Sequence, residues 1–138
     1  ETDNAIAYKD FAHSPSKVLA TTNALKNQYP DRELIACLEL HTYSSLNPEF
    51  LNQYKGALAA ADISVVFYSP RAVEIKKLQA ISQQQIMDAF QSDDLLVYTN
   101  PEEFKDFLFS QKFNNTSLLL MSSGNYGGLN FDELKQLF

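Results

Sequence analysis

Apolar residues gather in five short, nearly continuous runs, at residues 5–8, 34–40, 63–68, 95–99 and 117–121. Each run has the length of a strand, and most are rich in branched and aromatic side chains. Continuous rather than alternating apolar character is typical of strands buried on both faces, as in a parallel sheet covered by helices. The pattern therefore predicts a mostly parallel sheet of about five or six strands.

Between these runs, apolar residues recur at helical spacing. Helices are predicted over residues 15–29, 48–61, 83–91 and 101–111, with a short one from Phe131. Because strands and helices alternate, the sequence predicts a three-layer α/β sandwich with right-handed crossovers. Residues 69–81 fit neither period, so a helical turn, an extra edge strand and a long excursion all stay open there.

Three predicted helices begin with the same signal, a capping side chain followed by proline, at Ser14-Pro15, Asn47-Pro48 and Asn100-Pro101. Ser82 and Gln85 have the spacing of a capping box. Each proline-marked helix follows a predicted strand, so the helix N-termini are expected to gather at the carboxyl edge of the sheet. Ligands of open α/β sheets bind along that edge, which is where we look for a site.

The composition is that of one globular domain, which we take to span residues 1–138. Hydrophobic residues make up 45% of the chain, enough for an ordinary core. A net charge of -6 argues against a nucleic-acid or anionic membrane surface, because either would need clustered lysine and arginine. The single cysteine, Cys37, excludes an internal disulfide and fits a reducing cytoplasm.

The ends and the apolar stretches carry no membrane or export signal. No stretch approaches the length of a membrane span, and residues 1–4 lack the features of a signal peptide. The chain does not begin with methionine, which can mean processing and equally suggests a domain of a longer protein. Motifs that such a protein needs can therefore lie outside this chain.

The first candidate site is the turn that carries Asp10 and His13, between the first predicted strand and the first predicted helix. At a helix N-terminus, backbone N–H groups and the helix dipole favour anionic ligands. Asp10 can accept from ribose hydroxyls, and His13 can donate to a phosphate or stack on a base. Equally, Asp10 and Ser14 can satisfy only the turn amides while His13 fills space. Residue spacing leaves both interpretations open.

Two further polar turns follow the second and the last predicted strand. Residues 39–46, Glu-Leu-His-Thr-Tyr-Ser-Ser-Leu, offer groups suited to a polar zwitterionic ligand. Residues 121–128, Met-Ser-Ser-Gly-Asn-Tyr-Gly-Gly, hold three of the four glycines, which permit close backbone approach to a ligand. Either turn can also be an ordinary connection, the first capped by Asn47 and the second leading from strand to helix.

Several established motifs are absent from the sequence. Neither the Gly-x-x-x-x-Gly-Lys-(Ser/Thr) phosphate loop nor the Rossmann glycine spacing occurs. The Gly-x-Ser-x-Gly nucleophile turn is also missing, which argues against covalent hydrolysis. His13 and His41 are the only histidines, so we expect no dedicated transition-metal site.

Residues 8–15, Tyr-Lys-Asp-Phe-Ala-His-Ser-Pro, resemble the Asp-(Tyr/Phe)-Ala-His-x-Pro signature of the Mur ligases. The likeness continues in residues 34–44, 59–63 and 120–128, so it spans nearly the whole chain. Mur ligases are ATP-dependent amide-forming enzymes that build the peptide of bacterial cell-wall precursors. The signature opens their third, carboxyl-terminal domain, so the resemblance implies a Rossmann-like domain of such an enzyme in the bacterial cytoplasm. The turn at residues 121–128 is most similar to that of a member that adds a peptide.

The resemblance also implies roles for individual residues. The nucleotide would contact Asp10, Phe11 and His13, with Asp10 on the ATP ribose. The residues facing the incoming peptide would be His41, Thr42, Tyr43, Ser44, Ser45, Ser122, Ser123, Asn125 and Tyr126. The implied partners are UDP-N-acetylmuramate, a peptide, and preceding domains that hold most of the ATP and magnesium. Because the phosphate loop is missing, this chain alone is predicted to be inactive.

Two alternatives stand beside this hypothesis. A Mur ligase that adds a single amino acid, such as alanine, would carry similar motifs. A non-catalytic α/β binding module, whose polar loops contact a protein partner, would share the fold. The sequence also departs from many relatives at Lys9, at Ser14 and in residues 40–42, where they carry aspartate, histidine and arginine.

Overall fold

The computed structural model describes residues 5–42, 46–77, 80–92 and 94–134. In this part of the chain five strands form one sheet, in the order β1-β5-β2-β3-β4. All neighbouring strands pair in parallel. The predicted α/β fold is confirmed, and the strands are β1 Ala5–Asp10, β2 Glu33–Glu39, β3 Ile63–Phe67, β4 Leu96–Tyr98 and β5 Thr116–Met121.

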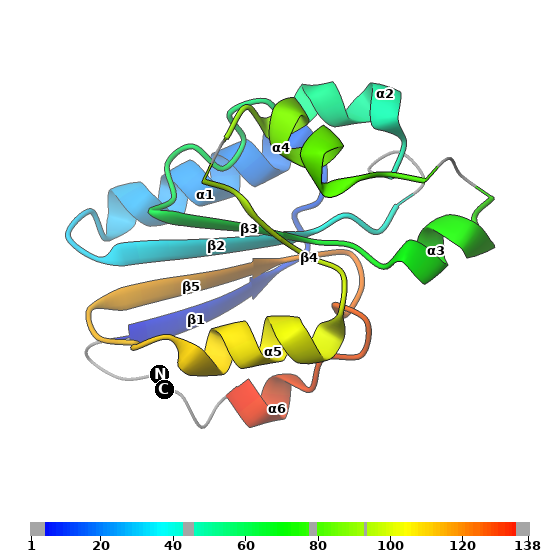
Figure 1. Cartoon of the computed structure of the whole chain (residues 1–138). Coiled ribbons are helices and arrows are strands. Elements are labelled where there is room, and N and C mark those ends of the chain that lie inside the picture. The colour runs from blue at the N-terminus through cyan, green and yellow to red at the C-terminus, as the bar shows by residue number, and fades with distance from the viewer. Residues whose placement is uncertain (1–4, 43–45, 78–79, 93, 135–138) are drawn as a thin grey trace.

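Helices cover both faces of the sheet, which makes three layers (Figure 1). The helices α1, α2 and α4 lie over one face, and α5 and α6 lie over the other. Among the described residues, none of these helices is long and apolar enough to span a membrane. Their bounds are α1 Pro15–Gln28, α2 Pro48–Leu51, α3 Pro70–Ile75, α4 Gln83–Phe90, α5 Pro101–Ser110 and α6 Phe131–Leu134, with a 3-10 turn, η1, at Asn52–Tyr54.

Strand β2 lies in the middle of the sheet and contributes to the core on both faces. Leu34, Ala36 and Leu38 pack in the cluster that includes Val18 of α1, whereas Ile35 and Cys37 pack in the cluster that includes Phe104 of α5. Successive side chains of a strand point to opposite faces, so burial on both faces requires an unbroken apolar run. This requirement explains the continuous pattern seen in the sequence.

One predicted segment differs from the structure, and one open segment is assigned by it. The helix predicted over residues 48–61 is too long, because α2 and η1 end at Tyr54 and turns follow. Gly56 has a φ of +73°, in the left-handed region that ends a helix. In the open segment 69–81, residues 70–75 form α3, and its Ser69 cap accepts from the Ala72 N–H at 3.3 Å.

All four predicted helix starts are confirmed, and a side-chain capping hydrogen bond is formed at three of them. Asn47 accepts from the Glu49 N–H at 2.9 Å, and Asn100 accepts from the Glu102 N–H at 2.8 Å. The capping box of Ser82 and Gln85 is formed. Ser14 occupies the cap position of α1 in extended geometry, but its side chain makes no capping hydrogen bond, so the expected amide contact there is wrong.

Asp62 gives the fold a measurable dependence on pH. It accepts from Lys26 Nζ and from the Leu34 N–H, each at 2.8 Å. Burial raises the pKa of this carboxyl, but the two hydrogen bonds and the Lys26 charge lower it by more, so it lies below its usual 3.8. Because the folded pKa is lowered, the contribution to stability is complete above that usual value and is lost as the pH falls through the folded value.

We expect Asp62→Asn to reduce the loss of stability that occurs as the pH falls. The Asp62 side chain is 45% exposed, so solvent screening limits the effect to about 1 kcal/mol or less in the free energy of unfolding. Urea unfolding of both proteins between about pH 2 and pH 7 measures the difference, since the usual pKa of aspartate lies within that range. Parallel stability curves for the two proteins would contradict the role given to Asp62.

Candidate functional site

The three polar turns identified in the sequence meet at the carboxyl edge of the sheet. They follow β1, β5 and β2, which are adjacent strands. Asp10 lies in register with Met121, and Met121 with Leu38. The Ser122 N–H donates to the Asp10 carbonyl at 3.0 Å, which ties the first turn to the last. The topology therefore brings together segments that lie more than a hundred residues apart in the sequence.

Local hydrogen bonds shape the turn between β1 and α1. Asp10 Oδ1 accepts from the Ala12 N–H at 2.7 Å, and His13 Nδ1 donates to the Phe11 carbonyl at 2.7 Å. The Tyr54 hydroxyl of η1 donates to the His13 carbonyl, and burial raises the pKa of this phenol to about 12. Asp10 thus satisfies a turn amide, as one of the two interpretations of the sequence expected, whereas His13 rather than Ser14 makes the second side-chain bond of the turn.

The same turn also presents surface to a ligand. Phe11 is 78% exposed, and Asp10 is exposed as well. Asp10, Phe11 and His13 line a hollow of about 280 Å³ together with Lys17 of α1. A carboxylate, an imidazole, an ammonium group and an aromatic ring beside a helix N-terminus can bind a ligand with hydroxyl, phosphate and aromatic parts.

The polar groups of the edge divide between the two faces of the sheet. Asp10 points to the α1 face, because its register partner Met121 packs in the core cluster of that face. Lys9 points the other way, and its Nζ lies 4.1 Å from the centre of the Phe131 ring of α6. Leu38 packs on the α1 face, and successive side chains of a strand point to opposite faces. Glu39, the next residue of β2, therefore points to this second face. A ligand that contacts both groups of residues must therefore cross the strand ends.

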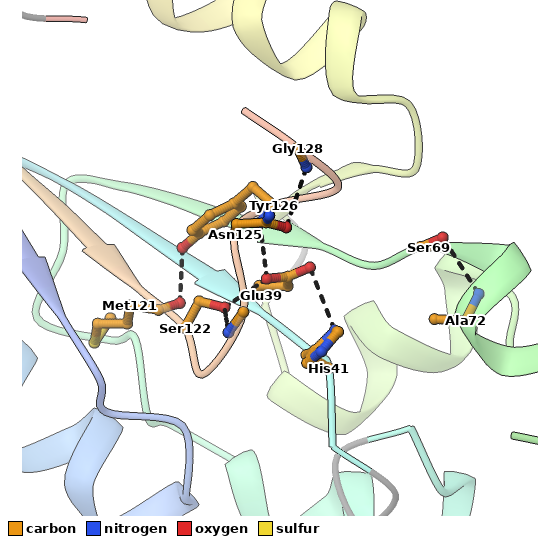
Figure 2. Close-up of polar contacts among 10 residues, drawn as sticks. Glu39, His41, Ser69, Ala72, Met121, Ser122, Asn125, Tyr126 and Gly128 are labelled. Atoms are coloured by element: carbon orange, nitrogen blue, oxygen red, sulfur yellow. Dashed lines mark hydrogen bonds and ion pairs between the residues drawn. The ribbon is translucent and has the colours of Figure 1, made fainter. Parts of the chain in front are cut away.

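The second group of residues centres on Glu39, the last residue of β2 (Figure 2). Its Oε1 accepts from the Ser122 hydroxyl at 2.5 Å and from the Tyr126 N–H at 2.9 Å. The Ser122 oxygen in turn accepts from the Gly124 N–H at 2.7 Å. The Oε2 atom faces His41, whose Nδ1 is 3.8 Å away. One carboxylate thus connects the turn after β5 with the loop after β2.

Tyr126 shapes its turn from within the core. Its side chain is 1% exposed and stacks on Phe104 at 5.1 Å between ring centres. Its hydroxyl donates to the carbonyls of Cys37 and Met121, at 2.9 and 2.7 Å. Burial raises the pKa of this phenol well above its usual value. Tyr126 therefore holds the turn on the sheet and does not present its ring to the outer surface.

The remaining expected site residues occupy different environments. Ser123 and Asn125 are exposed on the outside of the turn, whereas Ser122 is 7% exposed and faces Glu39. His41 and Thr42 are half-buried just after β2. The expected residues Tyr43, Ser44 and Ser45 lie outside the described part of the chain. The sequence placed the Glu39 acid among the groups that residues 39–46 offer to a ligand, but its side chain is 2% exposed and is bonded to Ser122 and Tyr126 instead.

The fold and this edge define a class of protein. The chain is an open parallel α/β domain whose polar turns gather at the carboxyl ends of adjacent strands, where such sheets bind ligands. Within the described residues, no group of three or more histidine, cysteine, aspartate or glutamate side chains is placed to hold a metal ion.

Comparison with known proteins identifies the family. The chain is 32% identical over 129 residues to the UDP-N-acetylmuramate–L-alanine ligase of Agathobacter rectalis, a match covering 92% of this chain and 28% of the relative. A solved domain from Haemophilus ducreyi, assigned to a UDP-N-acetylmuramate:L-alanyl-gamma-D-glutamyl-meso-diaminopimelate ligase, has a TM-score of 0.63, 23% identity, and coverage of 98% of this chain and 93% of that one. A murein peptide ligase from Psychrobacter arcticus has a TM-score of 0.72 and 18% identity, covering 98% of this chain and 28% of that one. No family model matches.

This chain belongs to the Mur ligase family, because curated relatives that match it over most of its length are Mur ligases. The resemblance seen in the sequence is thereby confirmed at the level of the family. The structural neighbours lie below 25% identity and establish the fold. The chain spans about a quarter of the length of the curated relatives, 28% and 23% of two of them.

Proposed function

We propose that this chain is the domain of an ATP-dependent amide ligase that contributes part of the nucleotide site and part of the incoming substrate site. The observation that carries the proposal is the hollow lined by Asp10, Phe11 and His13 beside the start of α1. It lies at the ligand-binding edge and is tied to the turn after β5 by the bond from Ser122 to Asp10.

In the proposed reaction, ATP supplies a phosphoryl group that activates a carboxylate, and the incoming amine displaces phosphate to form the amide. Positioning and charge neutralisation supply most of the rate in such chemistry. Asp10 holds the ribose hydroxyls, Phe11 offers a ring to the base, and His13 contacts the nucleotide with the edge of its ring that is not bonded to the Phe11 carbonyl. Magnesium and most of the triphosphate contacts belong to another domain, in a bacterial cytoplasmic enzyme.

The loop from His41 and the turn at residues 122–126 face the incoming substrate in this proposal. His41, Thr42, Ser123 and Asn125 are the described residues with surface to offer, while Ser122 and Tyr126 support the turn from inside. The loop and turn meet at the Glu39 carboxylate, so they form one surface. A zwitterionic amino acid or peptide matches the mixture of imidazole, hydroxyl and amide groups.

For the substrate, we favour a peptide joined to UDP-N-acetylmuramate. The sequence of residues 121–128 supports this choice by its similarity to the murein peptide ligase turn. The alternative, free L-alanine, is supported by the 32% identity to an alanine-adding relative. The two candidates differ in size and charge, so a direct assay separates them.

The experiment measures amide formation by the longer protein that carries this chain, supplied with ATP, magnesium and UDP-N-acetylmuramate. We expect turnover with L-alanyl-γ-D-glutamyl-meso-diaminopimelate and little with free alanine. Turnover with free alanine but not with the peptide would show that alanine is the substrate. Turnover with neither would contradict the proposed function.

The 138-residue chain on its own is expected to give no amide product under the same conditions. It lacks a phosphate-binding loop, so the triphosphate has no complete site. A matched assay of the longer protein, at equal concentration, serves as the positive control. Measurable product from the isolated chain would show that the division of the ATP site between domains is wrong.

A further inference from the structure

Glu39 is a buried charge in a place where an apolar residue could complete the core. It is 2% exposed and ends β2, directly after five residues, 34–38, that are all buried and apolar. Burying an ionised carboxylate is unfavourable unless hydrogen-bond donors replace the lost water. Here the donors come from Ser122 and Tyr126, both in the turn after β5. The carboxylate therefore holds that turn against the end of β2.

Gly124 shows how closely the turn is fitted to this carboxylate. A Cβ atom on Gly124 would lie 3.0 Å from Glu39 Oε1 and 3.1 Å from His41 Cδ2. Both distances are shorter than an ordinary carbon contact of about 3.5–4.0 Å. The absence of a side chain at residue 124 thus lets the turn, the carboxylate and the imidazole pack together.

The same carboxylate also lies beside His41, just after β2. Its Oε2 lies 3.8 Å from His41 Nδ1, within the range of an ion pair when the imidazole is protonated. The His41 side chain is 42% exposed, so part of the ring remains open to a ligand. Figure 2 shows the carboxylate between the imidazole and the turn. Burial keeps Glu39 itself away from any substrate.

We propose that Glu39 is a positioning residue that fixes His41 and the turn at residues 122–126 in one arrangement for the incoming amine substrate. This inference rests on the proposed function and assigns Glu39 a part in it. Glu39 acts on the incoming substrate and not on ATP, because its contacts lie on the second face of the sheet and Asp10 lies on the α1 face.

The test uses the longer protein that carries this chain, with three variants. Glu39→Leu removes the acceptor, Glu39→Gln keeps one oxygen acceptor, and Gly124→Ala keeps Glu39 but pushes the turn away from it. Glu33→Gln is the control, because it removes an exposed carboxylate from the other end of the same strand.

We expect Glu39→Leu and Gly124→Ala to raise KM for the incoming peptide by about 10- to 100-fold, as displacement of a positioned group by about 1 Å does. The KM for ATP should stay within about twofold of the unmodified protein, and Glu39→Gln should restore part of the loss. The second readout is hydrogen exchange of residues 122–126, which should become faster in Glu39→Leu because the Tyr126 N–H loses its acceptor.

An unchanged KM for the peptide in both Glu39→Leu and Gly124→Ala would overturn the inference. So would an equal rise in the KM for ATP, since that result would indicate general damage to the fold. If Glu39→Leu fails to fold, Gly124→Ala decides the outcome. Absence of turnover in the unmodified protein would contradict the proposed function, and the exchange rate of residues 122–126 would then decide whether Glu39 positions the turn.

Discussion

Replacing Asp10 by alanine is expected to raise KM for ATP by about 10- to 100-fold, because a hydrogen bond to a charged group contributes about 1.5–3 kcal/mol and each 1.4 kcal/mol is a factor of ten. The KM for the peptide should change little. Steady-state kinetics of the longer protein, with each substrate varied in turn, measures both values.

The turn itself depends on Asp10, so a control must separate ligand contact from local structure. Asp10→Asn retains a side-chain oxygen that can accept from the Ala12 N–H, as Oδ1 does in the unmodified chain. It loses the negative charge that favours the ribose hydroxyls, so its KM for ATP should still rise. Asp31→Ala, at an exposed aspartate near the start of β2, should behave as the unmodified protein. Nucleotide kinetics unchanged in both Asp10 variants would contradict the role of this carboxylate.

The largest expected effect on stability is that of Phe104→Ala. Phe104 is fully buried, and its ring centre lies 5.1 Å from that of Tyr126 and 5.7 Å from that of Phe67. Removing a buried phenylalanine costs about 3–5 kcal/mol, because transfer energy is lost and a cavity remains. Urea unfolding at neutral pH measures the difference.

A second consequence of Phe104→Ala concerns the site. Tyr126 rests on the Phe104 ring, so we expect the turn that Tyr126 holds to loosen and hydrogen exchange of residues 122–126 to become faster. Phe109→Ala, on the same helix at 38% exposure, is the control and should change the free energy of unfolding by about 0.5 kcal/mol or less. Equal losses in the free energy of unfolding from both variants would contradict the role of the Phe104–Tyr126 ring stack in the core.

The strands could be predicted because each one corresponds to a local run of apolar residues in the sequence. A strand buried on both faces needs an unbroken apolar run, and residues 34–40 supply one. The starts of α1, α2, α4 and α5 could also be predicted, because the residues that mark a helix start are neighbours of the helix in sequence. Ser69-Pro70 carries the same signal for α3, and it was overlooked because the following residues have no clear helical stripe.

The overlong helix at residues 48–61 has a different cause. Its apolar residues Leu51, Tyr54 and Leu58 keep a helical spacing, and all three are buried. Gly56 interrupts them with a left-handed backbone, which the period of the apolar residues does not reveal. Packing of Tyr54 on Phe90, at 5.3 Å between ring centres, preserves the burial without a continuous helix.

Only part of the candidate site could be predicted from the sequence. Asp10 and His13 could be found because strand, turn and helix follow one another along the chain. The role of Glu39 depends on Ser122 and Tyr126, which lie 83 and 87 residues away in sequence. Such a contact follows from the strand order, in which β5 lies between β1 and β2. No local sequence pattern indicates that order. The burial of Tyr126 has the same origin.

In the function we propose, the turn at residues 10–13 holds the nucleotide at the carboxyl edge of the sheet. The most direct measurement is a crystal structure of the longer protein with a non-hydrolysable ATP analogue. We predict that the Asp10 carboxylate lies within hydrogen-bond distance of the ribose hydroxyls, with Phe11 and His13 against the nucleotide. A bound analogue whose ribose lies away from Asp10, with this hollow filled by solvent, would contradict the account.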